Sequence, residues 1–169
     1  MDLGVDGVAR LEAGLQELFD VERAPLGETR EELRRRGRQQ VFGFCVGEAK
    51  EVQYLTLKPS VDPAALDKEE HSSAWRGLNS GLLQLVLGHI LDLDSKTLTR
   101  GEKVRFVKVE AEVFSLLKEA PDRAGFFLNP VDMAQLREVV LAGERMPPKS
   151  TFFYPKVYSG LVIQDLNAF

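Results

Sequence analysis

The chain is poor in the residues that build disulfide frameworks and metal sites. Its 169 residues include one cysteine, Cys45, and two histidines, His71 and His89. A single cysteine excludes a disulfide framework and a cysteine-based zinc site. Cys45 stands between Phe44 and Val46 in a strand-like run, so we expect a buried and unreactive thiol. The histidines are isolated from each other and from a third ligand, so no metal site is predicted.

The chain also lacks an excess of positive charge and a long hydrophobic run. Its formal net charge is −4, so no overall field attracts nucleic acid or an anionic membrane. The longest apolar run, Leu78–Leu91, contains Asn79, Gln84 and His89. It is shorter than the roughly 20 apolar residues of a membrane span, so we expect a buried helix. Because the first residues show no signal-peptide pattern, a cytoplasmic location is predicted.

Hydrophobic periodicity predicts an α+β fold with one mixed sheet of about five strands packed by helices. Strands are expected at residues 40–46, 51–57, 104–109, 125–128 and 161–166. Helices are expected at residues 6–20, 72–91, 111–119 and 129–142, with a short charged segment at 28–38. The alternation of strand and helix after residue 104 is typical of βαβ crossovers, and the earlier hairpin is expected to join the same sheet. We expect one domain over residues 1–169, with 1–38 as a helical lead-in to the sheet-containing core, 39–169.

The stretch 144–156 combines three prolines, three adjacent aromatic residues and two lysines. Proline fixes φ and removes a backbone donor, so this stretch is neither helix interior nor central strand. Its Lys-Ser-Thr triplet is typical of phosphate-binding loops, but no Gly-rich cradle precedes it, so we expect an anion site and not a Walker loop. The candidate ligand-binding residues are Lys149, Ser150, Thr151, Tyr154, Lys156 and Glu144. The simpler alternative is a rigid loop whose hydroxyls bond its own turns and whose rings anchor it to the core.

Three stretches, Gly125–Pro130, Met146–Lys156 and Ser159–Val162, resemble the C-terminal end of an uncharacterised bacterial and archaeal family. This family is the domain of unknown function 1015, sometimes labelled SpoOJ/ParA/ParB/RepB-like. Its members usually carry a larger N-terminal part with an Asp-Gly-His-His-Arg motif, which is similar to ParB and sulfiredoxin nucleotide-handling folds. That motif does not occur in this sequence. The resemblance therefore implies the C-terminal portion alone and carries over no chemistry centred on the motif.

These features lead to three hypotheses about function. In the preferred one, the chain is an accessory C-terminal domain that packs against an N-terminal domain of the same or a companion chain. Its loop Pro147–Lys156 then completes a ligand pocket with a phosphate or nucleotide anion site. The second is a stand-alone phosphoryl- or nucleotide-handling enzyme, which needs further acid, base or metal-binding groups near the loop; in sequence, Glu144 alone is within reach. The third is a nucleic-acid-binding module through the arginines of 30–38, although interleaved glutamates favour a solvated helix face.

The sequence leaves the chemistry itself open. No Ser-His-Asp or Cys-His arrangement can be assembled from the spacing, so no catalytic residue is assigned. No cofactor is indicated, and a homo-oligomer stays an open alternative. Membrane binding and nucleic-acid binding are not expected, because the overall charge is negative.

Overall fold

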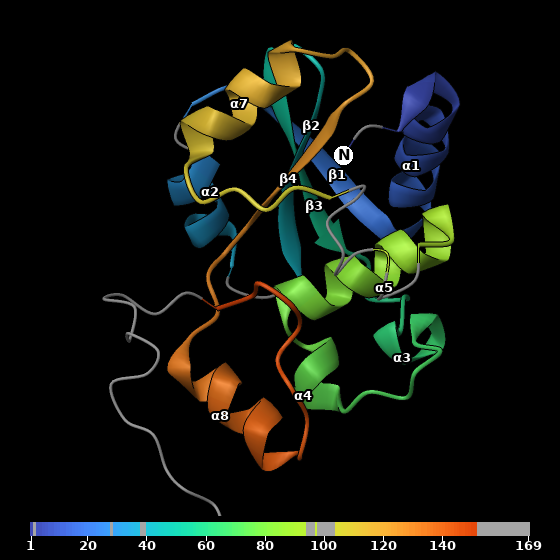
Figure 1. Cartoon of the computed structure of the whole chain (residues 1–169), viewed down its shortest axis with the longest axis vertical. Coiled ribbons are helices and arrows are strands. Elements are labelled where there is room, and N and C mark those ends of the chain that lie inside the picture. The colour runs from blue at the N-terminus through green and yellow to red at the C-terminus, as the bar shows by residue number, and fades with distance from the viewer. Residues whose placement is uncertain (2, 28, 38–39, 94–96, 98–103, 152–169) are drawn as a thin grey trace, which may run out of the picture.

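The computed structural model describes residues 1, 3–27, 29–37, 40–93, 97 and 104–151, which form one sheet flanked by helices (Figure 1). The strands are β1 (Phe19–Pro25), β2 (Val41–Val46), β3 (Glu51–Leu57) and β4 (Ala124–Leu128). The helices are α1 (Gly4–Leu18), α2 (Thr29–Arg36), α3 (Pro63–Leu66), α4 (Ser73–Arg76), α5 (Asn79–Leu91), α7 (Glu110–Lys118) and α8 (Met133–Leu141). The predicted α+β class with a single sheet packed by helices is confirmed. In the part of the chain that is described, none of the helices is both long and apolar enough to cross a membrane.

The described strands form an antiparallel sheet in the order β1-β3-β2-β4. β2 and β3 form the predicted hairpin at its centre, with Phe42 opposite Leu55. The sequence predicts a mixed sheet with βαβ crossovers, whereas the four described strands contain no parallel pair. Residues 104–109 run outside the sheet, because alternating apolar residues form a strand only where a neighbouring strand can pair with them. The predicted final strand, 161–166, lies outside the described residues.

β1 is an edge strand that the sequence pattern does not predict. It lies within residues 1–38, so the expected helical lead-in contributes a strand to the sheet as well as two helices. α1 ends at Leu18, and Phe19 then pairs with Leu57 at the start of the strand. The buried Phe19 ring contacts Phe42 with 5.6 Å between ring centroids. The spacing of the hydrophobic residues does not reveal that the helix ends and a strand begins at Phe19, because Phe19 fits the apolar stripe of a longer helix as well as the inner face of a strand.

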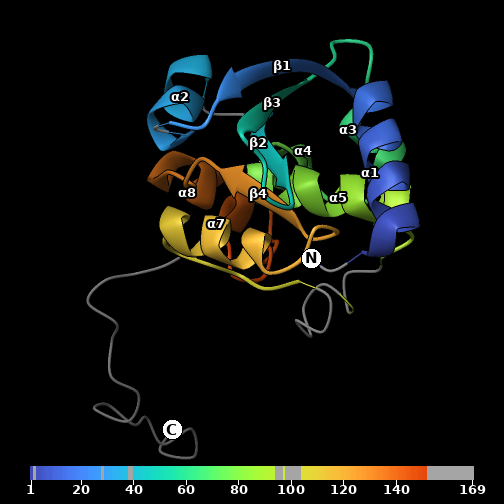
Figure 2. The same cartoon turned by 90° about the horizontal axis from the view of Figure 1, so that it is seen from above.

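Helices cover both faces of the sheet: α1 lies on one side of the strands, and α2 and α7 lie on the other (Figure 2). The first face packs Phe19, Phe42, Phe44, Leu55 and Leu57 against Leu11, Leu15, Leu82, Val86 and Ile90 of α1 and α5. The second face packs Val41, Cys45, Val52 and Tyr54 against Leu33 of α2 and Leu117 of α7. The predicted alternation in β3 is confirmed, with Val52 and Tyr54 on one face and Leu55 and Leu57 on the other. Because both faces are covered, β2 is buried along nearly its whole length.

The Leu-rich stretch after residue 72 forms two helices, α4 and α5, and not the single helix that the sequence predicts. The sequence predicts Ser72 or Ser73 as the cap of this helix, and Ser72 caps α4, because its hydroxyl oxygen accepts a hydrogen bond from the main-chain N–H of Trp75 at 3.2 Å. The chain is then extended at Leu78 before α5 begins. Gly81 allows the two helices to approach closely, since a Cβ atom there would lie 2.4 Å from the carbonyl oxygen of Trp75. A third apolar cluster attaches α8 to these helices and consists of Trp75, Leu78, Leu85 and Val139.

Candidate ligand-binding cavity

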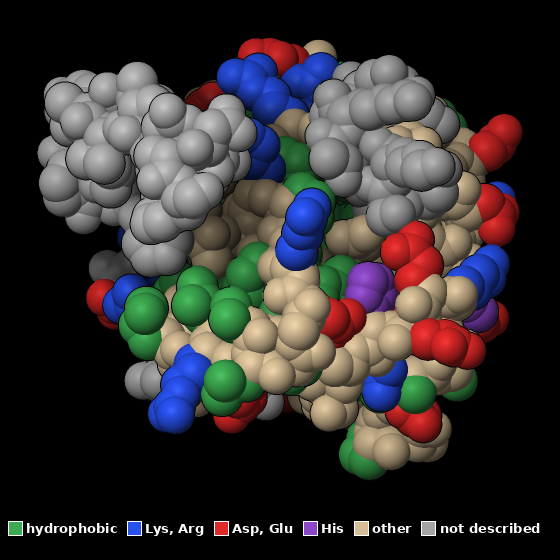
Figure 3. Space-filling view, turned by 60° about the horizontal axis from the view of Figure 1, so that its bottom comes forward, with side chains coloured by type: hydrophobic (Ala, Val, Ile, Leu, Met, Phe, Trp, Pro, Cys, Tyr) green, Lys and Arg blue, Asp and Glu red, His purple; other side chains and the backbone are tan. Residues whose placement is uncertain are grey.

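A cavity of about 1250 Å³ lies beside β4, at the edge of the sheet. Its walls are β4, α7, residues 104–110, one side of α5 and the turn 147–151. Figure 3 shows a recess that contains hydrophobic side chains and has a Lys or Arg side chain at its edge. Small-molecule pockets measure roughly 300 to 1,000 Å³. The cavity is therefore larger than a small ligand alone requires.

The turn Pro147–Ser150 brings three of the candidate ligand-binding residues to this cavity. Lys149, Ser150 and Thr151 all line it. Ser150 donates its main-chain N–H and its hydroxyl to the carbonyl oxygen of Pro147, at 3.2 Å and 2.7 Å. In this turn Pro148 is the second residue and Lys149 is the third. Lys149 has a φ of 59°, in the left-handed region that a type II turn requires at its third residue. The turn therefore holds Lys149 at the edge of the cavity in a defined main-chain conformation.

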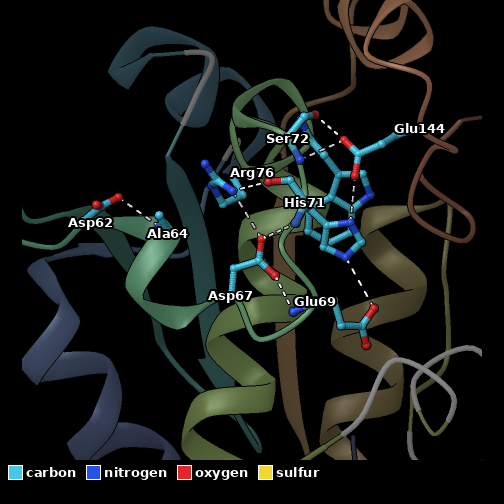
Figure 4. Close-up of polar contacts among 9 residues, drawn as sticks. Asp62, Ala64, Asp67, Glu69, His71, Ser72, Arg76 and Glu144 are labelled. Carbon is cyan, nitrogen blue, oxygen red and sulfur yellow. Dashed lines mark hydrogen bonds and ion pairs between the residues drawn. The ribbon is translucent and has the colours of Figure 1, made fainter.

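The other candidate ligand-binding residues are not found at the cavity. Tyr154 and Lys156 lie outside the described residues. Glu144 does not line the cavity, and its carboxylate points to the start of α4 (Figure 4). Its Oε1 lies 2.9 Å from Nδ1 of His71, and its Oε2 accepts both the main-chain N–H of Ser72, at 2.9 Å, and the Ser72 hydroxyl. Burial raises the pKa of Glu144, but the hydrogen bonds from Ser72 and His71 outweigh this effect, so its pKa lies below the ordinary value.

Sequence reasoning misses the polar cluster around Glu144. The His71 ring stacks on Trp75 with 3.8 Å between ring centroids. Asp67 accepts the main-chain N–H of His71 at 2.7 Å and lies 3.4 Å from the guanidinium of Arg76 (Figure 4). Because 73 residues separate Glu144 from His71, spacing along the sequence carries no signal for this contact. The cluster ties the end of α8 to the start of α4, which positions the chain that enters the Lys149 turn.

Basic side chains outnumber acidic ones around the cavity. The basic residues in its walls are Arg30, Arg105, Lys108, Arg123 and Lys149, and the acidic residues are Glu110 and Glu119. Arg105 is paired with Glu112 at 2.9 Å, and Arg123 is paired with Glu119 at 2.8 Å. Within the described part of the chain, Arg30 and Lys149 form no ion pair. These two side chains are therefore the cations best placed to bind an anion in the cavity.

Asn129 lies in the cavity wall with one buried atom unpaired. Its Nδ2 donates to the carbonyl oxygens of Leu33, at 3.0 Å, and Gly37, at 2.7 Å, at the end of α2. The sequence predicts that Asn129 caps the helix that follows it; this is wrong, because Asp132 caps α8 in a capping box with Gln135. Asn129 binds α2 instead, since the last carbonyls of a helix have no intrahelical partner. Its buried Oδ1 has no hydrogen-bond partner among the residues described, so a donor group in the cavity would satisfy it.

The arginine cluster of α2 is engaged by acidic neighbours. Arg35 lies 2.6 Å from Glu32, and Arg36 lies 2.7 Å from Glu32 and 2.6 Å from Glu22. The hydrogen bond from Arg35, supported by Arg36, lowers the pKa of Glu32 to about 2. Arg38 lies outside the described residues. Arg35 and Arg36 are thus held in ion pairs along their own surface, whereas Arg34 forms no ion pair with the described residues.

The one thiol of the chain is inaccessible. Cys45 is buried in β2, and burial, with a smaller contribution from the Glu110 carboxylate, raises its pKa to about 12. This agrees with the predicted unreactive thiol. Over the described ranges, no group of three or more His, Cys, Asp or Glu side chains is arranged to hold a metal ion.

Comparison with known proteins finds no match to a family model, to a curated protein or to a solved structure. The resemblance to the domain of unknown function 1015 therefore stays a prediction. The functional proposal depends on the cavity itself, which is lined by Lys149, Ser150 and Thr151 as well as by Arg30 and by Asn129, whose Oδ1 is unpaired among the described residues.

Proposed function

We propose that the chain is an accessory ligand-binding domain whose cavity beside β4 receives a phosphate-bearing ligand at the Lys149 turn. The observation that supports this most is the position of Lys149, Ser150 and Thr151 in one cavity with a second unpaired cation, Arg30. In this proposal an N-terminal domain of the same or a companion chain closes the cavity, as the family resemblance implies. The ligand is then bound between the two domains.

The turn assigns different roles to its polar side chains. Lys149 and Arg30 supply positive charge, and a hydrogen bond to a charged group contributes about 1.5 to 3 kcal/mol. The hydroxyl hydrogen of Ser150 is engaged within the turn, so Ser150 holds the turn in shape, whereas the exposed Thr151 is free of that bond. Phe106, half exposed in the wall of the cavity, offers an apolar surface. A phosphate ester with an aromatic or apolar part, such as a nucleotide, fits these groups better than inorganic phosphate does.

The exposed face of α8 supports the accessory role. Met133, Val140 and Leu141 are 69%, 57% and 73% exposed. The sequence predicts Met133 and Val140 on the inner stripe of this helix, but among its apolar residues Val139 alone is fully buried. An apolar surface of this kind is typical of a protein interface. Because α8 leads directly into the Lys149 turn, a domain that covers this face also reaches the edge of the cavity.

The two alternative functions have less support. An enzyme acting alone needs an acid or base at the Lys149 turn, and Glu144, the residue considered for this role, is engaged by Ser72 and His71 instead. A nucleic-acid-binding module needs arginines free to contact phosphates. Arg35 and Arg36 are paired with glutamates of the same surface, which leaves Arg30 and Arg34 as the arginines of α2 without an ion pair among the described residues.

Titration calorimetry with adenosine diphosphate tests the proposal, using the wild type, Lys149→Ala and Lys50→Ala. Lys50 is an exposed lysine in the β2–β3 turn, away from the cavity walls, and serves as the matched control. Loss of one charge-assisted hydrogen bond is expected to weaken binding about tenfold or more in Lys149→Ala, with no change in Lys50→Ala. Equal binding by the wild type and Lys149→Ala, or no binding by the wild type, would remove the proposal.

A further inference from the structure

Among the described residues, the outer edge of β4 is paired along only part of its length. Met1 and Ala124 exchange two hydrogen bonds: the Met1 amine donates to the carbonyl oxygen of Ala124 at 2.8 Å, and the N–H of Ala124 donates to the carbonyl oxygen of Met1 at 2.9 Å. The N–H of Leu3 donates to the carbonyl oxygen of Asp122 at 3.3 Å. Reciprocal bonds of this kind define an antiparallel pair. Met1 and Leu3 therefore pair with the open edge of β4 in antiparallel fashion, and Figure 1 shows the N-terminus beside it.

The register of β4 shows which of its main-chain groups face the cavity. The carbonyl oxygen of Arg123 accepts from Gly47 at 2.9 Å, so residue 123 faces β2, and Ala124 faces away toward Met1. Along an antiparallel strand, the main-chain N–H and C=O groups of successive residues point alternately to one side and to the other. Phe126 and Leu128 therefore direct theirs away from β2, as Ala124 does. Neither residue makes a main-chain hydrogen bond on that side within the described part of the chain.

The cavity has the shape and lining of a groove for an added strand. Gly125 to Leu128 all line it, and its side walls carry apolar residues from helices on both faces of the sheet. These residues are Leu83 and Leu87 of α5 and Val113 and Leu116 of α7. Unpaired edges invite strand addition, in which main-chain hydrogen bonds supply affinity and flanking apolar pockets receive alternate side chains. The volume of about 1250 Å³ exceeds that of a small-molecule pocket and leaves room for a peptide segment.

We propose that this groove binds an extended strand of the partner domain, which runs antiparallel to β4 with its carboxyl end at Met1. In the register set by Met1 and Ala124, the residues of the added strand that stand two and four positions ahead of Met1 lie opposite Phe126 and Leu128. The added strand pairs the four free main-chain groups of these residues and becomes the fifth strand of the sheet.

The direction of this strand places the partner domain beside the ligand site. The strand enters the groove at the Leu128 end, where residues 129–131 and the Lys149 turn line the same cavity. The inference rests on the proposed function for the existence of a partner domain, and it adds the element by which that domain attaches. Its test follows amide exchange and not ligand binding, so a failure of one proposal is distinguishable from a failure of the other.

The test uses the whole chain with the six residues Thr-Val-Thr-Val-Thr-Val joined ahead of Met1. Amide hydrogen exchange is followed by NMR, and a Gly-Ser-Gly-Ser-Gly-Ser extension is the control. Tethering gives the segment a high effective concentration, and its alternating β-branched residues favour the extended, paired conformation, which a Gly-Ser segment does not. Exchange at Phe126 and Leu128 is expected to slow about tenfold or more with the first extension and to be unchanged with the second. Gly125 and Phe127, which already face β2, report that the sheet is intact.

Three results would overturn the inference. Equal exchange at Phe126 and Leu128 in both extended proteins would show that the edge accepts no added strand. Slow exchange at both amides in the unextended monomer would assign the groove to the chain's own residues. Slow exchange that appears only with dimer formation, measured by light scattering, would assign it to a second copy. A proline at the second position ahead of Met1 removes the donor to the carbonyl oxygen of Phe126 but keeps the acceptor for its N–H, so it is expected to weaken the pairing and to reduce the protection of Phe126.

Discussion

Glu144 and His71 lie 73 residues apart in the chain and meet with 2.9 Å between the carboxylate Oε1 and the imidazole Nδ1. The same carboxylate receives the main-chain N–H of Ser72. Glu144 therefore fixes the segment between α8 and the Lys149 turn to the start of α4, although it lies outside the cavity itself. This contact is therefore the first to be tested by mutation.

Replacing Glu144 by Gln is expected to lower the free energy of unfolding by about 1 kcal/mol. The variant keeps the shape of the side chain but weakens the charge-assisted hydrogen bonds to Ser72 and His71. Urea unfolding measures the effect, with Glu138→Gln on the exposed side of α8 as the control. Equal losses in the two variants would contradict the structural role of Glu144.

The stabilisation by Glu144 is expected to depend on pH. A carboxyl group whose pKa is lower in the folded than in the unfolded protein stabilises the fold above its unfolded pKa, here an ordinary value of 4.5, and this contribution is lost as the pH falls through the folded pKa. The difference in unfolding free energy between the wild type and Glu144→Gln is therefore expected to be full near neutral pH and to shrink below about pH 4.5. Urea unfolding over this range tests it, and a difference that does not change with pH would be inconsistent with a lowered pKa.

Gly81→Ala is expected to destabilise the protein by about 2 kcal/mol, as overpacking does. In an open helix the same change usually stabilises by up to about 1 kcal/mol. Here the new Cβ would lie 2.4 Å from the carbonyl oxygen of Trp75 and 2.8 Å from its ring. Gly88→Ala in the same helix is the control, because its closest contact would be 3.2 Å, to the carbonyl oxygen of Leu93. Thermal unfolding compares the two, and a Gly81→Ala protein as stable as the wild type would show that α4 and α5 are not in close contact.

Cys45 is expected to resist alkylation in the folded protein. Its thiol is buried and its pKa is raised to about 12, so the reactive thiolate is rare at neutral or mildly basic pH. Iodoacetamide labelling followed by mass spectrometry should give no product in buffer and complete labelling in guanidinium chloride. Rapid labelling without denaturant would mean that β2 is not buried as described.

Local signals in the sequence are sufficient for much of the fold. The β2–β3 hairpin follows from strand alternation. Asp62 followed by Pro63 is the pattern of an N-cap and a first-turn proline, which predicts a short helical turn, and the Asp62 carboxylate accepts the N–H of Ala64 at 2.9 Å at the start of α3 (Figure 4). The buried Cys45 follows from its apolar neighbours. Each of these predictions depends on residues a few positions apart.

Contacts between distant residues account for what the sequence does not reveal. β1 exists because residues 19–25 find β3 as a neighbour. Asn129 binds the end of α2, 92 residues before it, and not the helix it precedes. At the candidate site, the Lys-Ser-Thr triplet is visible in the sequence, whereas Arg30 joins it only because α2 packs beside β4. Motif spacing cannot report such pairings, because they are set by the packing of elements that are far apart in the chain.

We propose above that the Lys149 turn and Arg30 bind a phosphate group inside the cavity beside β4. The most direct measurement is a titration of ¹⁵N-labelled protein with adenosine diphosphate, followed by amide chemical shifts. The account predicts saturable shifts at Lys149, Ser150 and Thr151 and at Arg30, which disappear in Lys149→Ala. Shifts confined to surfaces outside the cavity, or none that saturate, would contradict it.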